Sequence, residues 1–477
     1  MGGIQVNLTK FYINGEFVDP VSSKTLEIIN PATEEKIGTV ALGSVEDLDK
    51  AVFAARKAFS ISSQLSKNSR LDIIETIREN YKKRFKDISE AIRLEMGAPI
   101  KLAEGAQAAT GLGHLKTAMS VLKNHEFEYK KGDYIVREEP IGVCGLITPW
   151  NWPINQIVSK FAPAFAAGCT VILKPSEIAP LSAMIIAEII HESKIPPGMF
   201  NLVNGLGNVV GEAMSAHKDI DMMSFTGSTR GGIAVATAAA TTVKRVSQEL
   251  GGKSANLILD DDLFSKSITN GIAHVMSNTG QSCNAPTRML VPQSRHDEAL
   301  EIAKNAVQRI KVGNPDDINS DLGPLVSIDQ FNKVQNLIEK GIEEGAKLVS
   351  GGKGKPDGLD KGYYVKPTIF GNVSNDMVIA KEEIFGPVLS IIPYNDIEQG
   401  VSIANNTIYG LAAYVTGEDQ NKCMEVARKL RAGQVSINYG SSGPAAPFGG
   451  YKQSGNGREK AEWGLDEFLE VKAIMGV

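Results

Sequence analysis

The sequence predicts an α/β protein with two tandem α/β domains, built on largely parallel sheets, and a small additional β domain. Residues 141–259 alternate short apolar runs with helical spans, and residues 260–435 do so again. A strand–helix–strand rhythm requires crossover connections, which produce parallel sheets that bind ligands at the carboxyl ends of their strands. Residues 127–136 and 468–475 have strand patterns that stand apart from both α/β domains.

Composition excludes several classes of partner. The 477 residues carry a net charge of −5, with 42% hydrophobic and 22% charged residues. This is ordinary globular composition, and at roughly 150 residues per domain the length suits two to four domains. The weak negative charge gives no reason to expect a nucleic acid or an acidic membrane as partner. No apolar run is long enough to cross a bilayer, and the first residues lack the pattern of a secretory signal.

The cysteines indicate a reducing compartment. Cys144, Cys169, Cys283 and Cys423 are widely spaced and include no Cys-x-x-Cys pair. This spacing supports neither a disulfide scaffold nor a zinc ribbon, so no metal site is predicted. We therefore expect a cytoplasmic protein.

The N-terminal part is expected to begin with strands and to continue with helices. Residues 11–18 read as a strand broken by the hairpin signal Asn14-Gly15, and a short strand follows at 37–40. Residues 45–96 and 101–123 repeat apolar side chains at helical spacing.

Residues 127–136 alternate in polarity around a turn at residues 131–133, which predicts a hairpin outside the helical layers. Such a hairpin is either a surface feature or an edge that pairs with another subunit. In the two α/β domains, the expected strands are 143–147, 170–174, 199–203, 222–225 and 244–247, and the expected helices are 154–167, 181–192, 209–216, 231–242, 297–309 and 328–344.

Polar residues follow several of these strands, at the sheet edge where ligands are expected. Residues 174–177, Lys-Pro-Ser-Glu, place a lysine and a carboxylate there. The carboxylate of Glu177 can accept both hydroxyls of a ribose, although an exposed salt bridge explains the motif equally well. Residues 149–153, Pro-Trp-Asn-Trp-Pro, hold the amide of Asn151 between two prolines. A rigid, uncharged donor suits a developing oxyanion, and simple packing of the tryptophans is the alternative.

Two glycine-rich loops open helices. Residues 205–211 suit a pyrophosphate on backbone amides, but their spacing G-x-G-x-x-x-G departs from the dinucleotide fingerprint. Residues 225–229 also connect a predicted strand to a predicted helix through a glycine, in the next strand–helix unit of the chain. A tight turn explains either loop alone, whereas two in register favour a nucleotide site. Residues 382–387 and 447–452 could be ordinary turns.

Two reactive side chains lie in loops of small residues. Cys283 stands between Ser282 and Asn284, and a free cysteine is most often simply a buried apolar residue. Glu249 precedes two glycines, which leaves room for a base that reaches its proton through a water; a helix-capping glutamate is the alternative. One crossover separates Glu249 from Cys283, so the two can meet in space.

Together these motifs resemble the aldehyde dehydrogenase superfamily over nearly the whole chain. The stretches 149–151, 174–177, 225–228, 249–252, 280–283 and 383–387 occur in that family's order and approximate spacing. Six motifs in one order are highly specific. The resemblance implies a coenzyme-binding domain (1–123 and 141–251), a catalytic domain (252–453) and an oligomerisation domain (124–140 and 454–477), and hence a homo-oligomer, either a dimer or a homotetramer.

The resemblance also implies residue roles. Cys283 would be the nucleophile, Glu249 the general base, and Asn151 an oxyanion donor beside the Cys283 N–H. The cofactor would be NAD, with NADP as the alternative, and the residues expected to bind it are Ile147, Trp150, Lys174, Ser176, Glu177, Gly207, Gly211, Phe225, Gly227, Ser228, Leu250, Gly251, Glu383 and Phe385.

Among these residues, Lys174 and Glu177 would hold the adenosine ribose, and Glu383 and Phe385 the nicotinamide ribose and ring. Gly207, Gly211 and Ser228 would contact the pyrophosphate. The carboxylate of Glu177 favours NAD because it would repel a 2′-phosphate, whereas the ammonium of Lys174 could tolerate one.

The implied reaction oxidises an aldehyde to a carboxylic acid through a thiohemiacetal and a thioester on Cys283. A thiol with a pKa near 8.5 is only a few per cent thiolate at pH 7. No His or Lys adjoins Cys283 in the sequence, so help must come from the fold or the cofactor.

The substrate and two rival activities stay open. Ser159 and residues 441–443 take places where members acting on simple aliphatic aldehydes often carry aromatics, so a polar or larger aldehyde competes with acetaldehyde. A coenzyme A-acylating dehydrogenase is one rival, against which Glu249 argues. A cysteine hydrolase, with esterase activity at most a side reaction, lacks a plausible triad histidine. A nucleotide-binding scaffold without turnover is a third.

Overall fold

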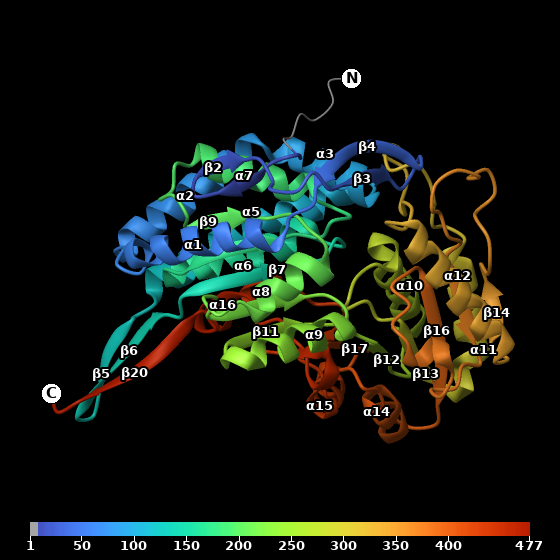
Figure 1. The fold of residues 1–477 in the computed structure, drawn as a ribbon. Helices are drawn as coiled ribbons and strands as arrows, with labels where there is room; N and C mark the ends of the chain where they lie inside the picture. The colour runs from blue at the N-terminus through green and yellow to red at the C-terminus, as the bar shows by residue number, and fades with distance from the viewer. Residues whose placement is uncertain (1–7) are drawn as a thin grey trace.

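The computed structural model describes residues 8–477, which form two large sheets, a projecting three-stranded sheet and a two-stranded ribbon (Figure 1). The ribbon pairs β3 (Thr25–Asn30) with β4 (Glu35–Ala41) in antiparallel fashion. The sequence-based expectation that the N-terminal residues are not a secretory signal concerns residues 1–7, which lie outside the described part. In residues 8–477, no helix combines the length and apolar character needed to cross a membrane.

The first large sheet has eight strands in the order β19-β11-β10-β7-β8-β9-β1-β2. Its five central strands are parallel, as the strand–helix rhythm predicts, and the outer three pair in antiparallel fashion. The strands are β1 (Phe11–Ile13), β2 (Glu16–Val18), β7 (Val143–Ile147), β8 (Thr170–Lys174), β9 (Phe200–Leu202), β10 (Met222–Thr226), β11 (Arg245–Glu249) and β19 (Gly455–Asn456).

Helices cover both faces of this sheet. Helix α6 (Pro153–Ala167) is buried along almost its whole length between β-strands and α5 (Ala109–Asn124), and its second half, Phe161–Ala167, is wholly apolar. The other helices around this sheet are α1 (Val45–Ser62), α2 (Lys67–Lys83), α3 (Phe85–Met96), α4 (Ile100–Leu102), α7 (Leu181–Glu192), α8 (Glu212–Ala216), α9 (Thr229–Ala239) and α16 (Ala461–Asp466).

Two spans expected to be regular helices contain wider π-helical turns. These are η1 (Ala103–Ala108), which runs into α5, and η2 (Gly207–Gly211), which runs into α8. Hydrophobic spacing cannot distinguish a single π turn from α-helix, because the apolar side chains still fall on one face.

The second large sheet has seven strands in the order β14-β15-β16-β13-β12-β17-β18, all parallel except the edge strand β14. The strands are β12 (Ala255–Ile258), β13 (Arg288–Pro292), β14 (Lys347–Ser350), β15 (Thr368–Gly371), β16 (Val388–Tyr394), β17 (Ala412–Thr416) and β18 (Gln434–Ile437). The helices around it are α10 (Phe264–Met276), α11 (His296–Val307), α12 (Ile328–Glu343), α13 (Val378–Lys381), α14 (Ile397–Asn405) and α15 (Gln420–Lys429).

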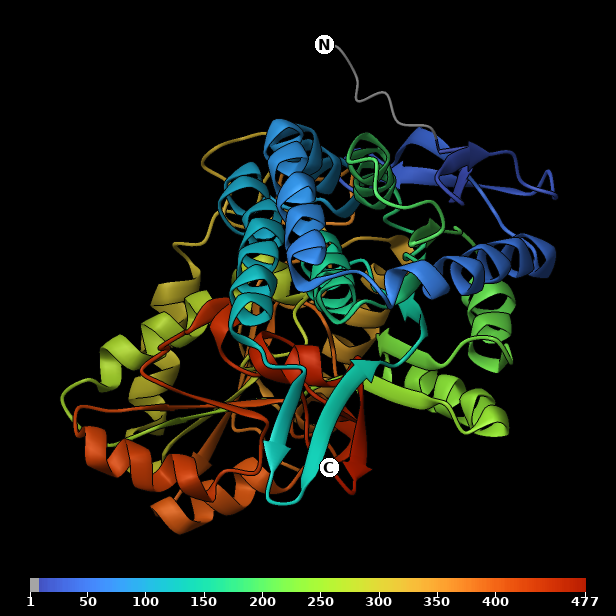
Figure 2. The ribbon, with the colours of Figure 1, turned by 90° about the vertical axis from the view of Figure 1, so that its left-hand side faces the viewer.

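The third sheet projects from the body as an arm (Figures 1 and 2). It consists of β5 (Glu128–Lys131), β6 (Tyr134–Pro140) and β20 (Leu469–Met475), with β6 in the centre. The C-terminal strand pairs with β6 over its full length, from Leu469 opposite Pro140 to Met475 opposite Tyr134. The expected union of the hairpin with the C-terminal strand is therefore confirmed, and so is the α/β fold class with its small β unit.

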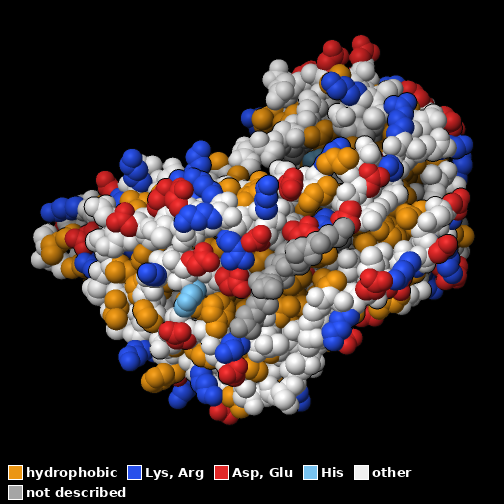
Figure 3. Space-filling model, turned by 90° about the horizontal axis from the view of Figure 1, so that it is seen from above, with side chains coloured by type: hydrophobic (Ala, Val, Ile, Leu, Met, Phe, Trp, Pro, Cys, Tyr) orange, Lys and Arg blue, Asp and Glu red, His pale blue; other side chains and the backbone are white. Residues whose placement is uncertain are grey.

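The surface mixes charges of both signs. Figure 3 shows acidic and basic side chains interspersed over the face seen from above, without a large field of one sign. This agrees with the net charge of −5.

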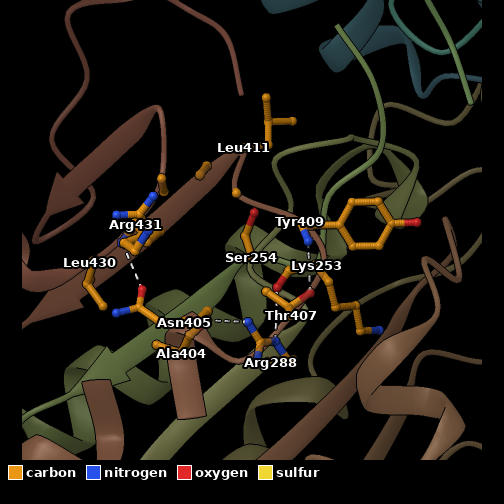
Figure 4. Close-up of a pocket in the computed structure, with 15 residues that line it drawn as sticks. Lys253, Ser254, Arg288, Ala404, Asn405, Thr407, Tyr409, Leu411, Leu430 and Arg431 are labelled. Atoms are coloured by element: carbon orange, nitrogen blue, oxygen red, sulfur yellow. Dashed lines mark hydrogen bonds between the residues drawn. The ribbon is translucent and has the colours of Figure 1, made fainter. Parts of the chain in front are cut away.

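A buried arginine joins the start of β13 to the end of α14. Arg288 donates from Nε to Lys253 O (2.9 Å), from Nη1 to Asn375 Oδ1 and Ile403 O (both 2.9 Å), and from Nη2 to Ala404 O (2.8 Å). The last two acceptors are carbonyls in the final turn of α14, and Ile403 O also accepts the N–H of the C-cap residue Asn406 at 3.2 Å. The adjoining cavity of about 10 Å³ is too small for a substrate (Figure 4). Arg288 is therefore structural.

Replacing Arg288 by Leu should lower the free energy of unfolding by about 3–5 kcal/mol, because it removes several charge-assisted hydrogen bonds and leaves their acceptors buried. Urea denaturation measures the change. Arg431 lines the same cavity but is exposed, so Arg431→Leu should change the stability by no more than about 0.5 kcal/mol. Equal effects of the two substitutions would contradict this role.

Candidate active site

A left-handed turn presents Cys283 at the junction of the two large sheets. After α10 the chain passes through Asn278, Thr279 and Gly280 with φ values of 55°, 56° and 70°. A Cβ on Gly280 would lie 2.0 Å from Gly386 O, so only glycine fits there.

The segment that follows β7 is bonded to the loop of Cys283. Asn151 is buried and its Nδ2 donates to Gln281 O (3.0 Å). Trp152 Nε1 donates to Ser282 Oγ (2.9 Å), and Asn278 Nδ2 donates back to Asn151 O (3.0 Å). The predicted oxyanion donor therefore lies beside the predicted nucleophile.

The turn after β11 touches the same loop backbone to backbone. Glu249 is the last residue of β11, so the helix-capping interpretation is wrong. A Cβ on Gly252 would lie 2.3 Å from Cys283 O, and one on Gly251 would lie 2.7 Å from Glu383 Oε2. Gly252 N–H donates to Glu383 Oε1 (2.9 Å). The structure thus brings Glu249, Cys283 and Glu383 to one place.

The Glu249 carboxyl lies in a dry, charged environment. It is 2% exposed, and within residues 8–477 neither of its oxygens has a hydrogen-bond partner. Burial raises its pKa well above the usual range, and the neighbouring Glu459 raises it further, whereas Lys160 and Lys460 lower it. The ammonium of Lys160 forms an ion pair with Glu459 and donates to Ser224 Oγ (3.1 Å).

The thiol of Cys283 is protonated in this environment. Burial, followed by the charges of Glu383 and Glu249, raises its pKa to about 12, while Lys460 and the Asn284 N–H lower it. Sequence analysis found no cation next to Cys283. The fold brings Lys460 near it, but that charge does not offset the cost of burial.

The predicted cofactor residues of the first sheet lie at the carboxyl ends of β7, β8 and β10. Lys174 Nζ donates to Pro175 O (2.9 Å) and to Glu177 Oε2 (3.1 Å). Gly211 lies against Ile147 and Lys174, with its Cβ position 3.7 Å from each side chain. Ser176 follows at the same edge and is buried, and its Oγ accepts the N–H of Ile178 at 3.3 Å.

The loop after β10 packs on an aromatic ring. Cβ atoms on Gly227 and Gly231 would lie 2.6 and 2.9 Å from Phe225 Cζ, so both positions require glycine. Ser228 caps α9 and accepts the Gly231 N–H (3.1 Å). Leu250 fills the space beside Gly232.

The second sheet supplies the opposite wall. Phe385 has a φ of 60°, and its ring stacks edge-on against Trp150, with centroids 5.4 Å apart at 89°. Gln330 Nε2 donates to Phe385 O (2.7 Å) and fixes this loop. Gly207 is the most open of the predicted residues, since its Cβ position has no atom within 4 Å.

Three charged residues near Glu249 were missed by the sequence analysis: Lys160, Glu459 and Lys460. Lys160 lies in an apolar helix and pairs with Glu459 almost 300 positions away. Ser159, next to Lys160 on the same helix, also donates to Glu459 Oε2 (3.3 Å). The sequence signal was the charged triplet Arg458-Glu459-Lys460 directly after a glycine-rich turn.

A thiol, a buried carboxyl and the strand-end loops of a parallel sheet define this as an α/β enzyme site of the kind that binds a nucleotide cofactor. The profile of the aldehyde dehydrogenase family matches residues 17–474, and this chain belongs to that family. Its members are oxidoreductases that act on aldehydes.

Relatives are similar over their whole length. A 3-succinoylsemialdehyde-pyridine dehydrogenase of a Pseudomonas species is 52% identical over 468 residues, which is 98% of each chain. A cysteine-to-alanine mutant of aldehyde dehydrogenase C from Pseudomonas syringae, solved with NAD⁺ and octanal, is 49% identical with a TM-score of 0.98, covering 100% of this chain and 99% of the other. An aldehyde dehydrogenase from Mycobacterium tuberculosis, solved with NAD⁺, is 38% identical with a TM-score of 0.95, covering 98% of each.

The raised pKa of Cys283 predicts how the free protein reacts with iodoacetamide. Only the thiolate is alkylated, so the rate should rise about tenfold per pH unit from pH 7 to pH 9.5 without a plateau. Mass spectrometry of the peptide that contains Cys283 measures the rate, and Cys283→Ser identifies alkylation of the other cysteines. A plateau below pH 8.5 would show a thiol with an ordinary or lowered pKa.

Proposed function

We propose that the protein oxidises an aldehyde to the carboxylic acid with NAD, using Cys283 as nucleophile, Glu249 as general base and Asn151 as oxyanion donor. The observation that carries this proposal is the contact of the Glu249–Gly252 turn with the Cys283 backbone. It holds a half-buried thiol and a buried carboxyl at one junction, where a covalent intermediate on the first is within reach of the second.

In the first step the Cys283 thiol loses its proton to solvent, and the thiolate adds to the aldehyde carbon, so that a C–S bond forms while the π bond of C=O becomes an alkoxide. Within residues 8–477 the Cys283 N–H has no hydrogen-bond partner, so it is free to donate to that alkoxide. Asn151 Nδ2 uses one hydrogen for Gln281 O and keeps the other. Two donors held in place before charge develops stabilise the transition state without reorganisation.

The strand-end residues fit NAD. Open backbone at Gly207, small residues at Gly211 and Gly227, and a hydroxyl at Ser228 leave room for a pyrophosphate above the sheet edge. Lys174 is already engaged by Glu177 and by a carbonyl, so it is poorly placed to attract a 2′-phosphate, which favours NAD over NADP. When bound, the nicotinamide supplies the hydride acceptor.

Glu249 is suited to the last step. Hydrolysis of the Cys283 thioester requires a base that takes a proton from water, and a carboxylate whose pKa is raised by burial is a stronger base than an exposed one. The carboxyl must first be ionised, so the hydrolytic rate should increase as pH rises through the pKa of Glu249. The missing hydrogen-bond partners leave both oxygens free for that water.

Two relatives indicate the size of the substrate. One was crystallised with octanal, and another is named for a semialdehyde that carries a pyridine. The cavity next to Asn284 has a volume of about 390 Å³, which is within the range of small-molecule sites. Residues 441–443 line it. An aldehyde larger than acetaldehyde fits this space.

The assembly and compartment are also proposals. The β20 edge of the projecting sheet exposes Val471 and Met475, which suits pairing with a second copy of the chain, as a dimer or tetramer. Free cysteines suit a cytoplasmic location. The division into coenzyme, catalytic and oligomerisation domains follows the three sheets, except that β19 of the C-terminal segment joins the first.

Purified protein should reduce NAD in the presence of octanal, and Cys283→Ser should abolish both turnover and any burst. Glu249→Gln should lower steady turnover at least about 100-fold and yet retain a burst of about one NADH per site, because acylation precedes its step. Stopped-flow absorbance measures both. A variant without the burst would contradict the role of Glu249, and acyl-CoA formation in the presence of coenzyme A would favour the acylating rival.

Replacing Asn151 by Ala should lower kcat/KM about 100- to 1000-fold, equivalent to about 3–4 kcal/mol of transition-state stabilisation. Trp152→Phe is the matched control, because it removes another side-chain hydrogen bond between the same two loops, the bond to Ser282 Oγ, without touching the oxyanion. It should cost less than about tenfold, the loss expected from one neutral hydrogen bond. Similar losses in both variants would mean that Asn151 only holds the loop.

A further inference from the structure

The cavity next to Asn284 has an unusual charge balance. It is lined by three rings that contact one another (His274, Tyr414 and Tyr439), by the backbone of Asn284, and by loops that carry serine hydroxyls. None of its lining residues in the described chain is acidic. Burial lowers the pKa of His274, which keeps it neutral near pH 7. Among the residues of the described chain that line this cavity, Lys460 is therefore the one whose side chain carries a formal charge.

Burial lowers the pKa of the Lys460 ammonium, and the carboxyls of Glu459 and Glu249 raise it only from beyond ion-pair distance. Within residues 8–477 the ammonium makes no hydrogen bond or ion pair, and Nζ lies 4.4 Å from the centre of the Phe448 ring, another wall of the cavity. The adjacent carboxylate, Glu459, is engaged by Lys160. A half-buried ammonium with free donors is costly, because burial removes water that is not replaced.

The backbone at Lys460 is held in a region that side chains avoid. Its φ of 74° and ψ of 156° lie where glycine is found almost exclusively, and Ala461 follows with a φ of 49°. Glycine would relieve this strain. The lysine is therefore retained against both its backbone preference and its desolvation, which indicates that the side chain has a use.

Activation of Cys283 does not account for that use. Lys460 does lower the pKa of the thiol, yet that pKa remains about 12 with the lysine in place. The ammonium is better placed to act on whatever fills the cavity. A single cation beside serine hydroxyls matches a monoanion, and a carboxylate accepts hydrogen bonds from both kinds of donor.

We propose that Lys460 binds a carboxylate at the far end of the aldehyde substrate, so that the enzyme prefers semialdehydes of dicarboxylic acids over uncharged aldehydes of equal length. The inference rests on the proposed function and adds the substrate class. Ser441 and Ser442, in the same cavity, supply hydroxyls for the second carboxylate oxygen.

The test compares kcat/KM for 5-oxopentanoate and pentanal, which differ in the terminal carboxylate, by following NADH formation. The wild type should prefer 5-oxopentanoate. Lys460→Met should lower the ratio of the two kcat/KM values about 10- to 100-fold, the size of a charge-assisted hydrogen bond, and Lys460→Arg should retain most of the ratio. Lys123→Met, an exposed lysine on α5, should leave the ratio unchanged.

Lys460→Gly shows whether a loss of preference comes from misfolding, because glycine suits this backbone conformation. This variant should lose the preference for 5-oxopentanoate over pentanal, and its melting temperature should be no lower than that of the wild type. As a second readout, glutarate should inhibit pentanal oxidation more strongly than pentanoate in the wild type, and this difference should disappear in Lys460→Met.

The outcomes separate this inference from the proposed function. If the wild type oxidises pentanal but shows no preference for 5-oxopentanoate, or if Lys460→Met slows both substrates equally, the assignment to Lys460 is wrong while the dehydrogenase stands. If the wild type oxidises neither aldehyde, the proposed function is wrong and the inference falls with it.

Discussion

The architecture of the site depends on two backbone contacts that exclude side chains. Gly252 lies against the carbonyl of Cys283, and Gly280 lies against the carbonyl of Gly386. A methyl group at either position would overlap the facing oxygen, at 2.3 and 2.0 Å. These contacts join the turn after β11, the loop of Cys283 and the loop that carries Glu383 and Phe385. Three segments from two sheets are thus fixed to one another without flexible side chains between them, which suits the positional accuracy that catalysis demands.

Burial sets the electrostatics of this junction. It raises the pKa values of both Cys283 and Glu249, which favours the neutral thiol and the neutral carboxyl in the free protein. Charges that develop during the reaction then meet fixed donors and ammonium groups in a medium that screens them poorly. Lys160 is paired with Glu459 behind Glu249, whereas Lys460 lines the cavity and forms no ion pair with any residue of 8–477. The two lysines therefore serve different sides of the same site.

Much of this could be predicted from the sequence, because local pattern and fold agree. Continuous apolar runs locate β7 and β8, whose bounds match the expected 143–147 and 170–174, and hydrophobic spacing locates α7 at 181–192. The motifs at strand ends lie at one sheet edge because parallel strands end together. The strand β3, at residues 25–30, was not foreseen, since only its partner has a clear strand pattern.

The network behind Glu249 could not be predicted in the same way. Lys160 and Glu459 are almost 300 residues apart, and no periodicity relates them. Lys160 interrupts an otherwise apolar helix and reads as a solvated residue, although it is 1% exposed. The backbone conformation of Lys460 arises from tertiary contacts at the start of α16, not from local propensity. Pairing of buried charges is a property of the folded chain, so a single sequence reveals it only once both partners are placed.

The most direct test of the central claim is the intact mass of Glu249→Gln after brief exposure to NAD and octanal. If Cys283 forms the thioester and Glu249 governs its hydrolysis, the mass should increase by one octanoyl group, and peptide mapping should place that group on Cys283. An acyl group on another residue, or none on a protein that has produced its burst of NADH, would contradict the account.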